Sequence, residues 1–202
     1  LRSFLTAMPQ WIQHKLPLRR EIRKELRKID NSASRSRKIL FASHHLSHAA
    51  SAFYPSPFAK AAILVIDAVG EWATATIAKG EGTQITFLRE MHFPDSVGLL
   101  YSAFTYFLGF KVNSGEYKLM GLSPYGDPSS AETQRFITLI REKFVTVFDD
   151  GSIRLNRSYF TYEYGLRMVS DTQWAKLFGI AKRLPTDPIR QAHCNLAFAI
   201  QA

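Results

Sequence analysis

The sequence predicts an α/β domain of the α+β kind, built on a mixed sheet and preceded by a helical extension. Three observations predict this class. Three β-prone runs follow one another between residues 61 and 91, which is typical of a meander. A helix that is apolar on nearly every side follows them, and such a helix belongs in a protein interior. Ahead of both lies a strongly basic segment, residues 1–38.

The basic segment carries nearly all of the net charge. Residues 1–40 hold eleven lysines and arginines against three acidic residues, which accounts for eight of the nine net positive charges. Leu18, Ile22, Leu26 and Ile29 recur at helical spacing, so residues 16–29 are predicted to form an amphipathic helix with a basic outer face. We interpret it as a solvated helix packed on the body. Nucleic-acid or membrane binding is the alternative, but no aromatic interleaving or recognised motif favours either partner.

Composition indicates one globular domain in a reducing compartment. The 202 residues are 46% hydrophobic, which is enough for a stable core without disulfides or structural metals. The single cysteine, Cys194, excludes an internal disulfide and favours a cytoplasmic location. No apolar run reaches the roughly 18 residues that a membrane span requires. The chain begins without methionine and ends inside an expected helix, so we expect a piece of a longer protein.

The body covers residues 39–202, and its first part is predicted to form a helix followed by the meander. A polar linker covers residues 32–37, and residues 39–42 are consistent with a short buried strand. Ser43 can cap a helix from His44 to Phe53, which the following Pro55 ends. The meander then consists of residues 61–67, 72–78 and 84–91, with its first strand the most buried.

The second part is predicted to be mostly helical. Asp95 or Ser96 opens the apolar helix Val97–Leu108, which Gly109 ends. The later elements are a short helix and turn at 115–126, a helix at 131–144, a hairpin of 145–148 with 153–155, a helix at 172–178 capped by Asp171, and a last helix begun by Asp187 and Pro188. A carboxylate at the tip of the first strand, with this order of elements, resembles half of an actin-like, ribonuclease H-like ATPase domain.

Two histidines one helical turn apart are the sharpest chemical signal. His44 and His48 lie on one face of the predicted helix. An apolar stripe of Leu46, Ala49, Ala50 and Phe53 lies almost opposite them, and His45 sits at the flank. Two imidazoles at this spacing are half of a site for a divalent transition metal, and the alternative is a pair of ordinary surface or capping histidines.

A second candidate site follows the first strand. Asp67 ends that strand, and Gly70 in the run Ala68, Val69, Gly70 and Glu71 would let backbone amides approach a phosphate or an adenylate. The alternative is a turn aspartate that satisfies its own backbone. Glu116 and Lys118 stand two residues apart and do not face each other on a helix, so their spacing predicts no ion pair.

Taken in order, these motifs resemble one known family. The blocks that carry the resemblance are His44-His45-Leu46-Ser47-His48-Ala49, Ile66–Glu71, Phe93–Tyr101 and Gly115–Gly126, followed by the helix from Arg190 to Gln201. In order and spacing they are similar to the NodU/CmcH-type O-carbamoyltransferases, over residues 39–202. The chain therefore resembles the metal-binding, actin-like N-terminal domain of that family.

The resemblance implies a two-step reaction. Carbamoyl phosphate and ATP give carbamoyl adenylate in a separate YrdC-like domain, and a hydroxyl of a sugar, antibiotic or Nod-factor-like acceptor then attacks it. The resemblance implies that His44 and His48 hold a divalent metal, with iron expected first and zinc or manganese as alternatives. It implies that residues 67–71, with Glu116 and Lys118, line the adenylate, and that Asp67 and His44 are the catalytic residues.

The family pattern also extends beyond both ends of this sequence. An upstream strand with an acceptor-side histidine, a downstream aspartate that completes the metal site, and the YrdC-like domain are not among these 202 residues. We therefore expect the isolated chain to bind metal weakly and to transfer no carbamoyl group. A non-catalytic nucleotide-binding or metal-binding module from a truncated gene is the alternative, and a kinase-like or chaperone-like ATPase is a third reading.

Overall fold

The computed structural model describes residues 4, 8–9, 11–29 and 38–202. The chain divides into two compact units, residues 1–43 and 44–202. The first contains a π-helix, η1 (Trp11–Lys15), and the helix α2 (Leu18–Ile29), so the predicted basic helix is confirmed. None of the residues of α2 is buried. The predicted polar linker, residues 32–37, lies outside the described residues, and the predicted domain division after residue 38 stays a prediction.

The predicted buried strand at residues 39–42 is wrong. This stretch forms no strand, and the side chains of Leu40 and Phe41 are 76% and 54% exposed. An apolar run becomes a strand only when another strand pairs with it. The strands of the described three-stranded sheet pair only with one another, and the chain enters a helix at His44 directly after this run.

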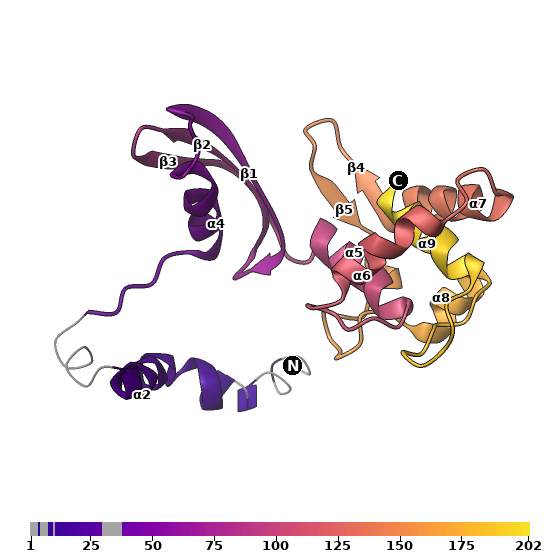
Figure 1. The fold of residues 1–202 in the computed structure, drawn as a ribbon, viewed down its shortest axis with the longest axis horizontal. Coiled ribbons are helices and arrows are strands. Elements are labelled where there is room, and N and C mark those ends of the chain that lie inside the picture. Colours follow the sequence, from indigo (N-terminus) through magenta and orange to yellow (C-terminus); the bar gives the residue numbers. More distant parts are fainter. Residues whose placement is uncertain (1–3, 5–7, 10, 30–37) are drawn as a thin grey trace. The chain divides into compact units, whose positions relative to one another are not determined.

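The second unit begins with helix α4 (His44–Phe53) on one face of a three-stranded sheet (Figure 1). The strands are β1 (Lys60–Gly70), β2 (Ala73–Glu81) and β3 (Gln84–His92), in the antiparallel order β1-β2-β3. Ala49 and Phe53 of α4 pack on Ile63 and Val65 of β1 and on Ala78 of β2. The predicted helix and the predicted antiparallel meander are both confirmed.

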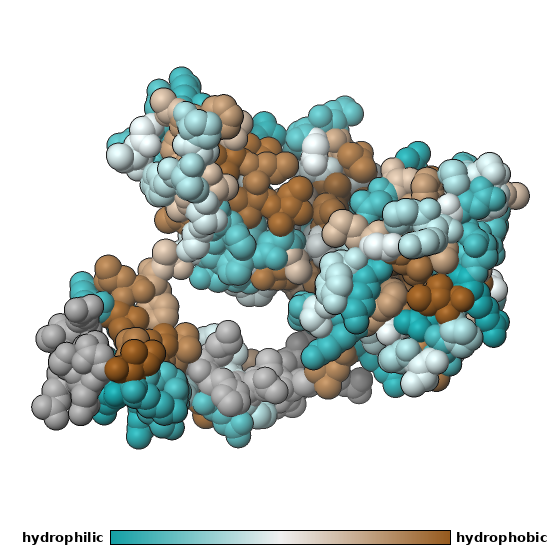
Figure 2. All heavy atoms as spheres, in the orientation of Figure 1, coloured by the Kyte–Doolittle hydropathy of each residue, from teal (hydrophilic) through white to brown (hydrophobic). Residues whose placement is uncertain are grey.

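The most buried strand is β2, which corrects the prediction that β1 is. β2 is paired on both edges and buries Thr74, Thr76 and Ala78. β1 is an edge strand, and Leu64 and Ile66 on its other face are 64% and 55% exposed. Figure 2 shows apolar side chains uncovered over the sheet. Apolar composition identified the strand but could not tell which of its faces another layer covers.

The remaining elements surround an aromatic core. Their bounds are α5 (Val97–Phe107), α6 (Glu116–Leu122), η2 (Ser123–Tyr125), α7 (Ala131–Leu139), η3 (Ile140–Phe144), β4 (Val145–Val147), β5 (Ile153–Leu155), η4 (Arg157–Tyr159), α8 (Asp171–Phe178) and α9 (Gln191–Gln201). Phe104 of α5 is fully buried against the rings of Phe144, Trp174 and Phe178. The prediction that α5 lies in the interior is confirmed.

Two predicted helix starts differ from the structure. Ser170, not Asp171, caps α8, because the Ser170 hydroxyl accepts a hydrogen bond from the Gln173 amide. The last helix begins at Gln191 rather than directly after Asp187 and Pro188. The Asp187 carboxylate instead accepts a hydrogen bond from the Leu184 amide, which closes a turn before the helix.

The α+β class is confirmed by these elements. Both sheets in the described part are antiparallel, so the mixed sheet that was predicted is not seen there. Neighbouring strands joined by short hairpins run antiparallel, because parallel neighbours need a long crossover connection. The assignment to the actin-like fold stays a prediction. Among the described residues, no helix is both long and apolar enough to cross a bilayer.

Candidate functional site

Helix α4 exposes two imidazole rings, those of His44 and His48, and buries a third, that of His45, against the sheet. Its buried residues are His45, Ala49 and Phe53, at four-residue spacing. Leu46, predicted to lie in the buried stripe, is 37% exposed, and His45 takes the inner position in its place. The reason is a polar contact, since Nδ1 of His45 lies 2.6 Å from the Thr76 hydroxyl of β2.

Strand β1 brings a carboxylate to the same place. Ile63 and Val65 point toward α4, and because side chains alternate along a strand, Asp67 points to that side as well. The pairing of β1 with β2 is regular up to Ile66 and resumes at Gly70 after a bulge. Bulges bend a strand and turn a side chain in a new direction, and this one lies directly at Asp67.

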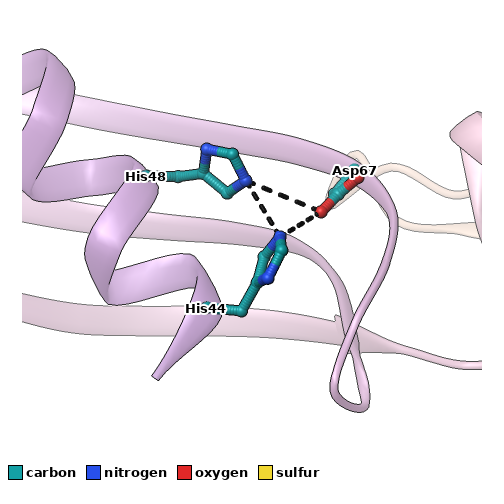
Figure 3. Close-up of side chains that lie close together, drawn as sticks. All are labelled: His44, His48 and Asp67. Carbon is teal, nitrogen blue, oxygen red and sulfur yellow. Dashed lines mark hydrogen bonds and ion pairs between the residues drawn. The ribbon is translucent and has the colours of Figure 1, made fainter. Parts of the chain in front are cut away.

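The two histidines and the aspartate meet at their polar atoms (Figure 3). Nε2 of His44 lies 2.6 Å from Oδ2 of Asp67 and 2.9 Å from Nε2 of His48. Nε2 of His48 lies 3.7 Å from the same carboxylate oxygen. The side chains are partly exposed, at 44% for His44, 52% for His48 and 29% for Asp67, so a ligand can reach them from solvent.

These three donor atoms lie close enough together that one metal ion could contact all of them. Ligand atoms bound to one ion at about 2.0–2.2 Å lie about 2.8–3.6 Å apart, from neighbouring octahedral positions to tetrahedral ones. The three observed separations, 2.6, 2.9 and 3.7 Å, bracket that range. No other such group of histidine, cysteine or acidic residues occurs within the described ranges. The sequence analysis places the completing carboxylate beyond Ala202, whereas the structure places Asp67 at the two histidines.

The charge state of Asp67 also suits a ligand. Partial burial works to raise the pKa of its carboxyl group. Three opposing interactions outweigh burial, so the pKa of Asp67 lies below its ordinary value. They are a 2.7 Å hydrogen bond donated by the Ala68 amide to Oδ1, the hydrogen bond with His44, and the electrostatic effect of His44 and His48. His45 behaves differently, because burial is the main cause that lowers its pKa and keeps its ring neutral.

A serine joins this strand tip to the start of α5. The Ser96 hydroxyl donates to the carbonyl oxygens of Ala68, at 2.7 Å, and Asp67, at 3.2 Å, and accepts from the Leu99 amide at 3.0 Å. It thereby caps α5 while it holds the backbone of β1. Gly98 allows this close approach, since a Cβ there would lie 2.7 Å from the backbone of Ala68.

An open cavity of about 400 Å³ extends from the tip of β1 along α5 to α6. Its lining residues are Ile66, Asp67, Ala68, Val97, Gly98, Tyr101, Ser102, Asn113 and Glu116. Three of the residues predicted to bind the adenylate therefore share one cavity, namely Asp67, Ala68 and Glu116. The others do not line it: Val69 is half-buried, Gly70 lies under the histidines, and Glu71 and Lys118 are exposed.

Glu116 is held in place by donors on three sides. Its carboxylate accepts hydrogen bonds from the Ser102 hydroxyl at 2.8 Å and from the amides of Asn113 and Gly115 at 2.9 and 3.1 Å. Burial works to raise the pKa of Glu116, but these hydrogen bonds outweigh it and the pKa lies below its ordinary value. The ionised form is therefore the one that the fold stabilises.

This charge state gives an acid-stability prediction. A lowered pKa in the folded state means that the stabilisation is complete above the unfolded pKa, about 4.3, and is lost as pH falls through the folded pKa. We expect Glu116→Gln to lower the free energy of unfolding by about 1 kcal/mol at pH 7. We also expect its stability to fall less steeply than that of the wild type below about pH 4.3. Urea unfolding at a series of pH values measures both, with Glu142→Gln, an exposed glutamate of η3, as control. Equal slopes for wild type and Glu116→Gln would contradict the prediction.

Sequence reasoning found the histidine pair and Asp67 and expected both imidazoles to face the cavity beside that carboxylate. It assigned Asp67 to the reacting groups and the adenylate rather than to the metal, because a sequence separation of 23 positions from His44 does not predict the distance between the two side chains. The contribution of His45, Thr76 and Ser96 was not foreseen either. The alternation of β1 carried a signal, since it sets Asp67 on the face of Ile63 and Val65.

Comparisons with known proteins agree on one family. The family model described as carbamoyltransferase N-terminus matches residues 1–202. An uncharacterised Synechocystis protein, sll1178, is 48% identical over all 202 residues, which cover 32% of its own length. The nodulation protein NolNO of Sinorhizobium fredii is 42% identical over 118 residues, which are 58% of this chain and 16% of NolNO. NolO of Bradyrhizobium diazoefficiens is 36% identical over 113 residues, which are 56% of this chain and 19% of NolO. The chain thus spans a third or less of the length of these relatives.

Proposed function

Because the chain belongs to the carbamoyltransferase family, whose N-terminal part it matches, we propose that its protein transfers a carbamoyl group to a hydroxyl of a small-molecule acceptor. The acceptor class is a sugar, an antibiotic or a Nod-factor-like molecule. The observation that carries the proposal is the convergence of His44, His48 and Asp67 on one point, together with the cavity that Asp67 and Glu116 both line.

The proposed donor is carbamoyl adenylate, made from carbamoyl phosphate and ATP in a YrdC-like domain of the parent protein. In the transfer step, the acceptor oxygen bonds to the carbamoyl carbon, the bond from that carbon to the phosphate oxygen breaks, and AMP leaves. The hydroxyl proton passes to a base in the cavity. The cavity beside Asp67 and Ala68 is our proposed place for the adenylate, and its volume of about 400 Å³ suits a ligand of that size.

Two imidazoles and one carboxylate form a donor set that suits iron(II), and zinc or manganese are the alternatives. A divalent ion bound there would supply positive charge that polarises the carbamoyl oxygen. His44 and Asp67, as the proposed catalytic residues, would act by ordering the reacting groups around that charge. The ionised carboxylate of Asp67 and the neutral buried ring of His45 support this arrangement.

The proposal is tested with the full-length protein that contains this chain. It is incubated with ¹⁴C-labelled carbamoyl phosphate, ATP and a panel of hydroxylated acceptors, and labelled product is separated and counted. We expect product with the wild type and a loss of at least about hundredfold with His48→Ala. His92→Ala is the matched control, because His92 is an exposed histidine on β3 outside the site.

Each outcome of this assay decides between the two functions. Product that depends on His48 but not on His92 supports carbamoyl transfer through this site. Metal binding without product from any acceptor supports the alternative, a non-catalytic nucleotide-binding or metal-binding module.

A further inference from the structure

The inner face of α4 contains a polar residue where packing alone would favour an apolar one. His45 is 2% exposed and lies in the buried row with Ala49 and Phe53. Its Nδ1 shares a 2.6 Å hydrogen bond with the Thr76 hydroxyl, and Thr76 is itself 1% exposed. Nε2 of the same ring is buried and has no hydrogen-bond partner among the described residues. A buried ring nitrogen without a partner costs free energy, so apolar packing does not explain this histidine.

The hydrogen bond between His45 and Thr76 can fix the rotation of α4 about its axis, which apolar contacts alone cannot do. Ala49 and Phe53 hold α4 against the sheet, but smooth apolar surfaces tolerate rotation of a helix about its axis. The bond from His45 to β2 fixes that rotation, because it joins one atom of the helix to one atom of the sheet. The fixed end is the first turn of α4, where His44 stands and from which His48 is one turn away.

The backbone of β1 at Gly70 lies against the rings of both His44 and His45. A Cβ on Gly70 would lie 2.7 Å from Cδ2 of His45 and closer still to Cδ2 of His44. A side chain there would displace both rings, so glycine lets the backbone of β1 lie directly against them. Gly70 is also where regular pairing with β2 resumes after the bulge at Asp67. The same short stretch therefore carries Asp67 and lies against the rings of His44 and His45.

We propose that His45 is a positioning residue for the metal ligands, which it aligns through its hydrogen bond to Thr76 and its contact with Gly70. This inference rests on the proposed metal site. The effect is large because the tolerance is small: a ligand nitrogen roughly 7 Å from the helix axis moves by about 1.2 Å when the helix turns by about 10°. Metal–ligand distances tolerate only about 0.2 Å.

The test compares metal affinity in two matched variants of the full-length protein that contains this chain. Thr76→Val removes the hydroxyl that His45 uses and keeps the shape of the side chain. Thr74→Val is the control, because Thr74 lies on the same strand, is 0% exposed, and donates its hydroxyl hydrogen bond to the Asp95 carbonyl instead. Each variant is titrated with Co²⁺, whose absorbance reports the geometry of its ligands, and its thermal unfolding is recorded.

We expect Thr76→Val to weaken Co²⁺ binding about tenfold and to change the absorbance spectrum, as the loss of a residue that orients metal ligands does. Thr74→Val should stay within about twofold of the wild type even where its Tm falls equally, since a merely structural hydroxyl lowers stability without altering the affinity of the folded protein. His45→Leu should behave like Thr76→Val. His45→Asn should recover most of the affinity, because its amide lies near the position of Nδ1 and can bond Thr76.

The outcomes separate this inference from the metal site itself. Binding by the wild type that Thr76→Val and His45→Leu leave unchanged overturns the positioning role and keeps the metal site. Equal weakening by Thr74→Val and Thr76→Val also overturns it, because the effect then follows stability. Absence of Co²⁺ binding by the wild type overturns both.

Discussion

Replacing Asp67 with alanine should lower the affinity of the chain for a divalent transition metal by at least about hundredfold. Loss of a group that merely orients a ligand already costs about 10–100-fold, and Asp67 is expected to be a ligand itself. Two effects combine. The variant keeps two imidazoles, which are only half of a site, and it loses the only carboxylate in the cluster.

Titration with Co²⁺ or Zn²⁺, followed by calorimetry, measures this loss. Asp149→Ala is the matched control, because Asp149 is an exposed aspartate between β4 and β5. His44→Ala should lose affinity to a similar degree, since Nε2 of His44 contacts both other donor atoms. Unchanged affinity in Asp67→Ala would mean that the metal binds elsewhere, and the assignment of this site would be abandoned.

Placing an alanine at Gly98 should destabilise the chain by about 1–3 kcal/mol, as overpacking of a close contact does. The added Cβ would lie 2.7 Å from the nitrogen and Cα of Ala68 and from the carbonyl oxygen of Asp67. All three are backbone atoms, which cannot move aside as the end of a flexible side chain can. Helix α5 must therefore shift from the tip of β1, and the bond from Ser96 to Ala68 must lengthen.

Gly121→Ala provides the opposite expectation within the same protein. Gly121 lies in helix α6, and a Cβ there meets nothing within 4 Å. Alanine in a helix is favoured over glycine by about 0.5–1 kcal/mol, so this variant should be slightly more stable than the wild type. Urea unfolding followed by circular dichroism compares the two. A Gly98→Ala protein as stable as the wild type would show that α5 and β1 do not approach this closely.

The parts of the fold that the sequence predicted are those decided by neighbouring residues. The apolar run of α5, its cap at Ser96 and its end at Gly109 are local signals, and the hairpin of β4 with β5 follows from Asp150 and Gly151. The failures were decided by distant partners. Residues 39–42 lacked a strand to pair with, and His45 took the inner face of α4 because Thr76, 31 residues away, bonds to it.

In the candidate site, too, the local features were predictable from the sequence and the features that depend on distant residues were not. The helical spacing of His44 and His48 and the strand-end position of Asp67 are readable from the sequence, since both depend on local periodicity. That the three share one point depends on the bulge in β1 and on the rotation of α4. Neither leaves a pattern in the sequence. Lys118 lies outside the cavity that Glu116 lines, because residues two positions apart on a helix such as α6 face different directions.

The hydroxyl of Ser96 ties the slow motions of two elements together. A helix cap contributes about 1 kcal/mol, and here the same oxygen also holds the strand beside Asp67. Fraying of α5 at its first turn and loosening of the strand end then become one opening event rather than two. Since local openings set the rate at which backbone amides exchange with solvent, the amides of both segments should share the protection of the deeply packed helix. Through Ser96, the packing of α5 in the aromatic core should therefore also limit the opening of the strand end that carries the Asp67 carboxylate.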